Sequence, residues 1–289
     1  MTHAGSFIGF GSFLDRLLPA IKCYPAPCKL LIVNNSGIDE ANKTIEIVEN
    51  SELNNVCETL VIPSPENNIA TGRNLVLHNT DTELLAFIDD DEYPTQHWLT
   101  EIVATMLDWR CVAVAGPAIP VYEAPSSRWI KSVDLHSANG KKTGDKLVTC
   151  ASANVLIDLS KTRNRQFDPE FGRSGGEDAH YFMSIVKEGG EVRWCNEATV
   201  YETIPMNKST SRYMLKRFMI QGEIHKRILK KNGDIHSMLL FNLRSFVVFL
   251  AAFPIGIALA LAGRPSAGNW IRRSFGNLGK LVSLPASLY

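Results

Sequence analysis

The sequence predicts an α/β fold in which helices flank a mainly parallel sheet. Short apolar runs that are typical of buried strands recur along the chain, and segments with apolar residues at three- and four-residue spacing lie between them. This alternation is typical of parallel sheets, whose neighbouring strands are joined by helices. With 289 residues, the chain can hold one large α/β domain and an additional segment.

The elements are expected in a regular order along the first two thirds of the chain. We predict strands at residues 29–35, 59–63, 84–91, 112–115, 153–159 and 192–195. We predict helices at residues 13–21, 38–49, 70–78, 98–107 and 178–186. Residues 1–206 are therefore expected to form one α/β catalytic domain, with a first strand that is degenerate or missing.

The remaining sequence is basic and then apolar. Residues 207–237 predict a basic amphipathic helix, a pattern shared by membrane-surface helices and by helices packed on their own domain. Residues 245–263 carry no charge and approach the ~20 apolar residues that span a bilayer; a buried core helix is the alternative. Basic residues flank this run on both sides and Pro254 can break it, so we expect it to form a kinked, re-entrant or interfacial hairpin with both ends cytoplasmic. Residues 238–289 as a whole are expected to be a hydrophobic membrane-associated segment and a basic tail.

Composition and the N-terminus indicate a cytoplasmic location for the α/β part. Lys+Arg and Asp+Glu number 30 each, so the net charge gives no reason to expect nucleic-acid binding. The six cysteines are scattered, without a Cys-x-x-Cys pair or a histidine spacing that indicates zinc. The first 13 residues lack the basic start and sustained apolar stretch of a secretory signal.

A run of carboxylates follows the predicted strand that begins at Leu84. Asp89, Asp90, Asp91 and Glu92 come directly after it, and ligands in open α/β sheets bind at the carboxyl ends of strands. In an extended backbone, Asp89 and Asp91 share one face and Asp90 lies on the other. Such hard oxygen donors suit Mg²⁺ or Mn²⁺, which bind one or two carboxylates together with substrate phosphate. A solvated acidic turn is the alternative.

A second acidic pattern lies at Gly175-Gly176-Glu177-Asp178, where a glycine turn opens a predicted helix. Carboxylates in the first turn of a helix are favoured by its dipole, so simple capping is one interpretation. Combined with the earlier run of three aspartates, the pattern favours a loop-borne general base at the edge of a metal and phosphate site.

Several motifs occur together in one order. They are residues 31–35 (LIVNN), 68–74 (NIATGRN), 87–91 (FIDDD) with Pro94 and Trp98-Leu99, 153–156 (ANVL), and Phe171-Gly172 through Glu177-Asp178. In this order and spacing, from about residue 29 to residue 205, the chain resembles a family 2 glycosyltransferase with the GT-A fold. It is most similar to bacterial enzymes that build exopolysaccharides on lipid-linked acceptors.

The resemblance implies roles for the acidic residues. Asp89, with Asp90 beside it, would contact the nucleotide-sugar donor, and Asp91 together with Asp89 would hold Mn²⁺ or Mg²⁺ on the diphosphate. Asp178 would deprotonate the acceptor hydroxyl in a single inverting displacement. A metal clamp is suited to this chemistry because it neutralises the charge that develops on the nucleoside diphosphate leaving group.

Four further residues complete the expected site. The resemblance places Asn34 on the donor, at a position where the family usually has an aspartate. Arg73 would bind the diphosphate or hold a site carboxylate, although an arginine on a helix surface is the commoner case. Glu177 would orient the loop or the acceptor. Residues 122–146, with Trp129, are expected to form an acceptor-facing loop.

The chain also departs from the family pattern. The usual first strand and nucleotide-gripping turn are at most degenerate between Gly5 and Gly11, and no Gln-x-x-Arg-Trp motif follows Asp178, which favours the addition of one sugar per visit. The expected partners are thus a nucleotide-sugar, in the first instance a UDP-sugar, a lipid-linked saccharide and the cytoplasmic face of the inner membrane, with no nucleic acid. A nucleotidyltransferase and a non-catalytic membrane-bound scaffold are the alternatives.

Overall fold

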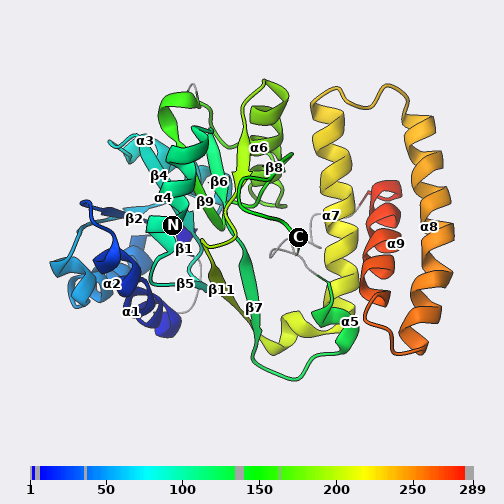
Figure 1. Ribbon diagram of the computed structural model, residues 1–289, viewed down its shortest axis with the longest axis horizontal. Helices are drawn as coiled ribbons and strands as arrows, with labels where there is room; N and C mark the ends of the chain where they lie inside the picture. Colours follow the sequence, from blue (N-terminus) through cyan, green and yellow to red (C-terminus); the bar gives the residue numbers. More distant parts are fainter. Residues whose placement is uncertain (1, 4–6, 36–37, 134–139, 163, 284–289) are drawn as a thin grey trace. The chain divides into compact units, whose positions relative to one another are not determined.

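The chain divides into two compact units in a computed structural model (Figure 1). The structure describes residues 2–3, 7–35, 38–133, 140–162 and 164–283. The first unit comprises residues 1–120, 136–173 and 177–202, and the second comprises residues 121–135, 174–176 and 203–289. The second unit thus takes in residues 121–135, 174–176 and 203–206, which the sequence pattern assigned to the catalytic domain.

The first unit contains the alternating strands and helices. Its elements are β1 (Thr2–His3), α1 (Phe7–Cys23), β2 (Lys29–Asn34), α2 (Ile38–Glu49), β3 (Glu58–Pro63), α3 (Ile69–Asn79), β4 (Leu84–Ile88), β5 (Glu92–Pro94), α4 (Trp98–Trp109), β6 (Ala113–Ala115), β8 (Lys146–Leu147), β9 (Asn154–Asp158), α6 (Glu177–Lys187) and β10 (Val192–Trp194). Two strands, β7 (Ala118–Tyr122) and β11 (Val200–Ile204), run across the unit boundary. Every predicted strand and helix coincides with one of these elements, and the largest shift is at α1, which begins at residue 7 instead of 13.

The strands form three sheets whose directions are more mixed than the expected, mainly parallel arrangement. In the order β1-β2-β3 the strands are parallel, whereas in the order β4-β9-β6-β10-β8 strand β9 runs antiparallel to both β4 and β6. A third sheet has the order β5-β11-β7. Among the described residues between β6 and β9, α-helix occurs only at 128–131, which is shorter than the crossover that parallel neighbours need.

The N-terminal strand is present but short. Thr2 and His3 pair in parallel with Val33 and Asn34 of β2. Gly9 and Gly11, which the sequence pattern placed in a degenerate strand and turn, lie in α1, and Gly5 is outside the described residues.

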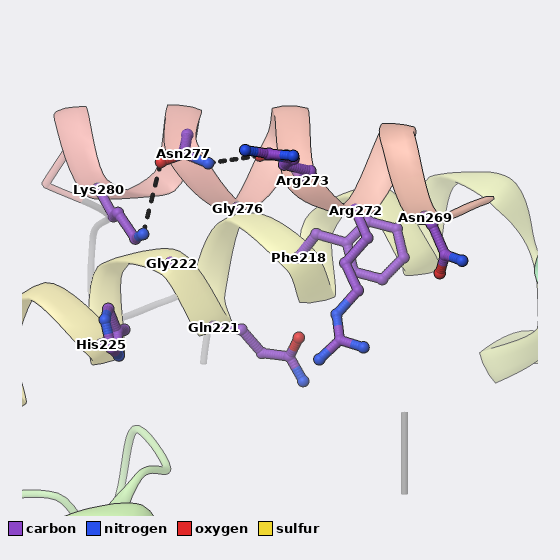
Figure 2. Close-up of a pocket in the computed structure, with 10 residues that line it drawn as sticks. All are labelled: Phe218, Gln221, Gly222, His225, Asn269, Arg272, Arg273, Gly276, Asn277 and Lys280. Atoms are coloured by element: carbon purple, nitrogen blue, oxygen red, sulfur yellow. Dashed lines mark hydrogen bonds between the residues drawn. The ribbon is translucent and has the colours of Figure 1, made fainter. Parts of the chain in front are cut away.

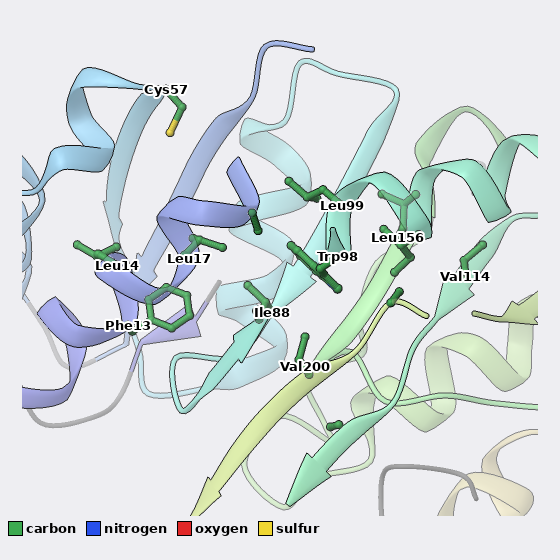
Figure 3. Packing of buried hydrophobic residues seen from close by; sticks show 14 of the residues in the cluster. Phe13, Leu14, Leu17, Cys57, Ile88, Trp98, Leu99, Val114, Leu156 and Val200 are labelled. Atoms are coloured by element: carbon green, nitrogen blue, oxygen red, sulfur yellow. The ribbon is translucent and has the colours of Figure 1, made fainter. Parts of the chain in front are cut away.

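Two apolar clusters form the core of the first unit. Successive residues of the central strands β4, β6 and β9 belong alternately to one cluster and to the other. Ile88, Val114 and Leu156 belong to the cluster that includes Trp98 and helix α1 (Figure 3). Their neighbours in sequence, such as Phe87 and Val155, belong to the other cluster, with the rings of Phe167, Tyr181 and Phe182. This division follows from the two-residue period of a strand, and it buries the central sheet on both faces.

The second unit is helical. It contains α5 (Arg128–Lys131), α7 (Ser211–Lys231), α8 (Met238–Leu261) and α9 (Ala267–Leu281), and α9 packs against both α7 and α8. Helices α7 and α9 approach closely where glycines leave room. A Cβ atom at Gly222 would lie 1.9 Å from the carbonyl oxygen of Gly276, and one at Gly279 would lie 2.0 Å from that of Met219.

Helix α8 corresponds to the predicted apolar segment. The expected break at Pro254 is wrong, because α8 continues through this residue as one helix. A proline removes one backbone donor, a loss that a long helix can tolerate. Only 17% of the most apolar 18-residue window of α8 is buried, and the helix is long and apolar enough to cross a membrane. The chain turns at Gly263, where φ is 66°, and returns along α9.

Candidate functional site

The N-terminus of α3 is tied to the segment that leads into the second acidic motif. Asn68 caps α3 by accepting hydrogen bonds from the backbone N–H groups of Ala70 and Thr71 at 3.1 and 3.2 Å. Its side-chain amide donates to the carbonyl of Pro169, and the N–H of Ile69 donates to the carbonyl of Gly172. A Cβ atom at Gly172 would lie 1.7 Å from Asn68 Oδ1, so only glycine allows this approach.

One turn further along α3, Asn74 makes two hydrogen bonds to Phe167. Its amide donates to the Phe167 carbonyl and its oxygen accepts from the Phe167 N–H, each at 2.8 Å. These contacts join residues 93 positions apart in the sequence. In the Asn68–Asn74 motif, Asn68 therefore caps α3. Asn74, its last residue, binds the backbone of Phe167, ten residues before Glu177.

Arg73 links the two acidic motifs. It lies on α3, is 4% exposed, and donates a hydrogen bond through Nη1 to Glu177 Oε1. Its Nη2 lies 3.8 Å from Asp89 Oδ1. Burial acts to lower the pKa of Arg73, but the charges of Glu177, Asp89 and Asp178 outweigh it and raise the pKa overall. Arg73 thus contacts a carboxylate from each acidic motif, and its role in donor binding stays a prediction.

The acidic run folds into a tight turn after β4. The N–H of Glu92 donates to the carbonyl of Asp89 at 3.2 Å, and the N–H of Asp89 donates to Glu92 Oε2 at 3.4 Å. Glu92 is 3% exposed and pairs across β5 and β11 with Glu202. Burial, with the charge of Asp89, raises the pKa of Glu92 well above its usual value. Glu92 therefore supports the turn from inside, a role that the sequence did not reveal.

A cavity of about 470 Å³ lies beside this turn. Its lining residues are Asn35, Asn67, Ile69, Asp89, Asp90, Asp91, Gly172 and Arg173. The cavity thus brings together the end of β2, the start of α3, the acidic turn and Gly172-Arg173. Of the predicted site residues, Asp89, Asp90 and Asp91 line it directly.

The polar residues at the end of β2 differ in their surroundings. Asn34 is fully buried, and its amide donates to Thr44 Oγ1 of α2 at 2.8 Å. The next residue, Asn35, lines the cavity, is 6% exposed, and its Oδ1 has no hydrogen-bond partner among the described residues. An unpaired buried amide oxygen is costly unless a ligand completes it, so Asn35 is a donor-binding candidate that the sequence reasoning missed.

Arg173 and Asn67 are two further cavity residues that the sequence reasoning missed. Arg173 forms an ion pair with Glu66, at 3.1 Å between Nη2 and Oε2. Neither residue stands out in the sequence, because both lie in polar loops and only the fold places them beside the aspartates. A guanidinium at this position suits the oxygens of a phosphate.

The acidic turn has the chemistry of a divalent-cation site. Burial, with the charges of Asp91 and Asp90, raises the pKa of Asp89 to about 6 although Arg73 acts in the opposite direction. Such crowding of carboxylates is relieved by a bound cation. Among the described residues, no group of three or more His, Cys, Asp or Glu side chains is arranged to hold a metal ion. Two aspartates nevertheless fit Mg²⁺ or Mn²⁺, which take their other ligands from water and substrate phosphate.

Asp178 lies in the first turn of α6, next to Glu177. Its Oδ1 accepts a hydrogen bond from the N–H of Ala179 at 2.6 Å, and its charge acts on Glu177 and Arg73. Burial, followed by this charge, raises the pKa of Glu177, and Glu177 Oε2 is buried without a hydrogen-bond partner among the described residues. Asp178 does not line the 470 Å³ cavity. The structure thus groups it with Arg73 and Glu177.

Trp129 belongs to the second unit. It lies on α5 and packs against a buried cluster that includes Ile130, Val133, Met214 and Phe218. Its proposed contact with an acceptor stays a prediction, and residues 134–139 of the expected acceptor-facing loop are outside the described residues.

Comparisons with known proteins show the family and the fold. The family model described as "Glycosyl transferase family 2" matches residues 12–165. The succinoglycan biosynthesis protein ExoM of Rhizobium meliloti (strain 1021) is 32% identical over 178 residues, which are 61% of this chain and 58% of that protein. The match thus spans little more than half the length of this relative.

Solved structures show the same fold at low sequence identity. The mannosyltransferase PcManGT from Pyrobaculum calidifontis, in complex with GDP-Man and Mn²⁺, has a TM-score of 0.66 and 12% identity, covering 96% of this chain and 84% of that one. S. aureus TarS 1-349 in complex with UDP-GlcNAc has a TM-score of 0.51 and 13% identity, covering 92% and 88%. The predicted GT-A-type α/β class is confirmed by these likenesses, and by the extent of the family match the chain belongs to glycosyl transferase family 2.

Proposed function

We propose that the protein is a metal-dependent, inverting glycosyltransferase that moves one sugar from a nucleotide-sugar to a lipid-linked or membrane-proximal saccharide in polysaccharide biosynthesis. The observation that carries the proposal is the position of Arg73, whose guanidinium contacts Asp89 of the cavity and Glu177 beside Asp178. A donor site and a candidate base are thereby joined through one buried side chain.

In this proposal, the 470 Å³ cavity receives the nucleotide diphosphate. Asp89 and Asp91 hold Mn²⁺ or Mg²⁺, which when bound neutralises charge on the leaving diphosphate. Arg173 contributes a further positive charge, and the unpaired Oδ1 of Asn35 accepts a hydrogen bond from the nucleoside. Asn34, which is hydrogen-bonded to Thr44, shapes the end of β2 and does not contact the donor.

Asp178 acts as the general base in the proposed reaction. It removes the proton of the acceptor hydroxyl while that oxygen attacks the anomeric carbon of the sugar and the nucleoside diphosphate leaves from the opposite side. The configuration at the anomeric carbon is inverted in this single displacement. Glu177, held by Arg73, fixes the first turn of α6 and with it the position of Asp178.

The similar proteins support the substrate class. One solved structure was obtained with UDP-GlcNAc and another with GDP-Man and Mn²⁺, so this fold accommodates nucleotide-sugars and a divalent metal. A relative that is 32% identical is a succinoglycan biosynthesis protein, which supports a role in polysaccharide assembly. The apolar, largely exposed helix α8 supports attachment to a membrane, and we assign the cytoplasmic face, where nucleotide-sugars are available.

Calorimetric titration with UDP, with and without Mn²⁺, tests the donor site. The detergent-purified wild-type protein is expected to bind UDP in a Mn²⁺-dependent manner, and Asp91→Asn is expected to lose that dependence. If the wild-type protein binds neither UDP nor GDP with the metal present, the proposal is wrong and a non-catalytic scaffold is favoured. Turnover of a nucleoside triphosphate into a nucleotide-sugar would instead indicate a nucleotidyltransferase.

A further inference from the structure

A basic groove runs along the helices of the second unit. It consists of two adjoining hollows of about 380 and 320 Å³, which share His225, Arg273, Asn277 and Lys280. The first is bounded by α7 and α9, and the second extends to Arg244 and Ser245 of α8. Figure 2 shows the first hollow, with side chains from α7 and α9 lying along it. Gly222 and Gly276 lie at the wall of this hollow, where α7 and α9 approach each other closely.

The described walls of the groove are rich in basic residues. Arg244, Arg272, Arg273 and Lys280 line it, and no aspartate or glutamate is among the described residues that do so. Residues 238–289 contain five basic residues and no acidic residue, although the chain as a whole has 30 of each sign. Cations that gather in a groove whose described walls hold no carboxylate form a site for an anion.

One of these cations, Lys280, has a side-chain contact on its own helix. Lys280 Nζ donates to Asn277 Oδ1 at 3.4 Å, and the Asn277 amide donates to the Arg273 carbonyl at 2.7 Å. Partial burial, followed by the charge of Arg244, lowers the pKa of Lys280. Gln221 and Asn269 supply further amide groups at the wall. Positive and neutral donors at one site are what the oxygens of a phosphate require.

An exposed apolar surface adjoins the groove on α8. Its residues, each between 37 and 85% exposed, are Met238, Leu239, Leu240, Leu243, Phe246, Val247, Leu250, Phe253, Ile255, Ile257 and Leu261. The same helix carries Arg244 in the groove and packs against Trp270 and Ile271 of α9 at Gly256. A cationic site for phosphate and a broad apolar surface on one helix are together complementary to an amphiphile with a phosphate head group.

The packing also constrains how α8 meets a membrane. Helix α9 lies against α8 and bears Arg272, Arg273 and Lys280. Placing α8 across a bilayer in this arrangement would carry those charges into the hydrocarbon, at a high free-energy cost. Lying along the surface, α8 can enter the acyl layer with its exposed side while the groove stays at the level of the head groups.

We propose that this groove binds the phosphate group of an anionic phospholipid, with α8 lying in the plane of the membrane surface. The inference rests on the membrane attachment in the proposed function and adds the lipid chemistry and the residues that recognise it. The lipid phosphate accepts hydrogen bonds from Arg273, Lys280 and Arg244, and its acyl chains lie beside the apolar residues of α8.

Vesicle flotation of the full-length protein tests the proposal. The wild-type protein is expected to bind vesicles of phosphatidylcholine with phosphatidylglycerol more tightly than vesicles of phosphatidylcholine alone. The double variant Arg273→Gln/Lys280→Gln is expected to lose about tenfold or more of this preference, since a basic residue at an anionic surface contributes about 1 kcal/mol. The matched control is Lys230→Gln/Lys231→Gln, which removes two exposed charges of α7 outside the groove and is expected to keep most of the preference.

Two results would overturn the lipid site. If both double variants lose the preference for phosphatidylglycerol vesicles equally, the lipid site is wrong, and the protein is attracted to the anionic surface by its overall positive charge in this region. Suppression of vesicle binding by millimolar inorganic phosphate or pyrophosphate, with tight binding of that anion in calorimetry, would overturn it in favour of a soluble anion. Mn²⁺-dependent UDP binding, measured on the same variants, is expected to be unchanged, so failure of the lipid site and failure of the proposed function are distinguishable.

Discussion

Arg73 donates a hydrogen bond to Glu177, a residue 104 positions later in the chain, and both side chains are about 95% buried. The same guanidinium lies 3.8 Å from Asp89. The acidic turn after β4 and the first turn of α6 are thus held by one cation on α3. A lysine carries the same charge but cannot present two separated donors from a planar group, so the contact requires an arginine.

Arg73→Lys is expected to lower both stability and sugar transfer. Breaking a buried ion pair leaves a carboxylate uncompensated and costs about 3–5 kcal/mol when one partner is removed, and the lysine should recover only part of that. Thermal unfolding and transfer rates measure the two effects. Arg165→Lys, at the more exposed pair with Glu188, is the control and is expected to change neither by much. Equal behaviour of the two variants would show that Arg73 has no special role.

Asp178→Asn is expected to abolish sugar transfer while leaving metal-dependent UDP binding intact. Asp178 does not line the donor cavity, and its proposed task is to remove a proton from the acceptor. Asp91→Asn, by contrast, should lose metal-dependent UDP binding. Calorimetry and a transfer assay on both variants check the separation. Residual transfer near the wild-type rate in Asp178→Asn would remove this residue as the base.

The neighbouring asparagines at the end of β2 are expected to respond differently to truncation. Asn35→Ala should weaken UDP binding and leave the unfolding temperature nearly unchanged, because its Oδ1 has no partner to lose among the described residues. Asn34→Ala should instead reduce stability by about 1 kcal/mol, since it removes the buried hydrogen bond from Asn34 to Thr44, whose hydroxyl keeps its own bond to the Glu40 carbonyl. Calorimetric titration and thermal unfolding measure the two properties. The reverse pattern would place Asn34 on the donor.

The sequence was sufficient where a repeated pattern carried the information. Strands and helices of the first unit followed from periodicity, and the motif order identified the family. The sequence was insufficient at the end of β2, where it did not show that Asn35, and not Asn34, lines the cavity. The apolar pattern does not determine the residue at which the strand ends, and a shift of one residue moves a side chain to the other face of a strand. The support of the acidic turn by Glu92 was also hidden, since it depends on pairing with the distant strand β11.

The second unit was harder to predict for a different reason. Residues 121–135 and 174–176 belong to it, although their sequence neighbours lie in the first unit. Such assignments depend on contacts between segments far apart in the chain, for example the hydrogen bond from Arg227 to Ser174 Oγ at 2.7 Å. Local patterns do not report these contacts. The proline in α8 likewise indicated a break that the helix does not have.

The turn before Glu177 is held by α7, and Gly176→Ala is expected to reduce sugar transfer strongly. Gly176 has φ of 97°, and a Cβ atom there would lie 2.2 Å from Ile224 Cγ2 of α7. The residue must therefore move, and Glu177 and Asp178 follow it directly in the chain. Transfer is expected to fall about tenfold or more, since small displacements of a catalytic group can cost far more than that.

Gly189→Ala is the matched control for this substitution. Gly189 follows the same helix, α6, with φ of 90°, and nothing lies within 4 Å of its missing Cβ, so alanine there adds backbone strain of about 1 kcal/mol without a clash. The two variants should therefore lose similar stability through strain, but only Gly176→Ala should lose transfer. Adding Ile224→Ala removes the clash and is expected to restore part of the rate. If both glycine variants are equally active, contact with α7 does not position Asp178.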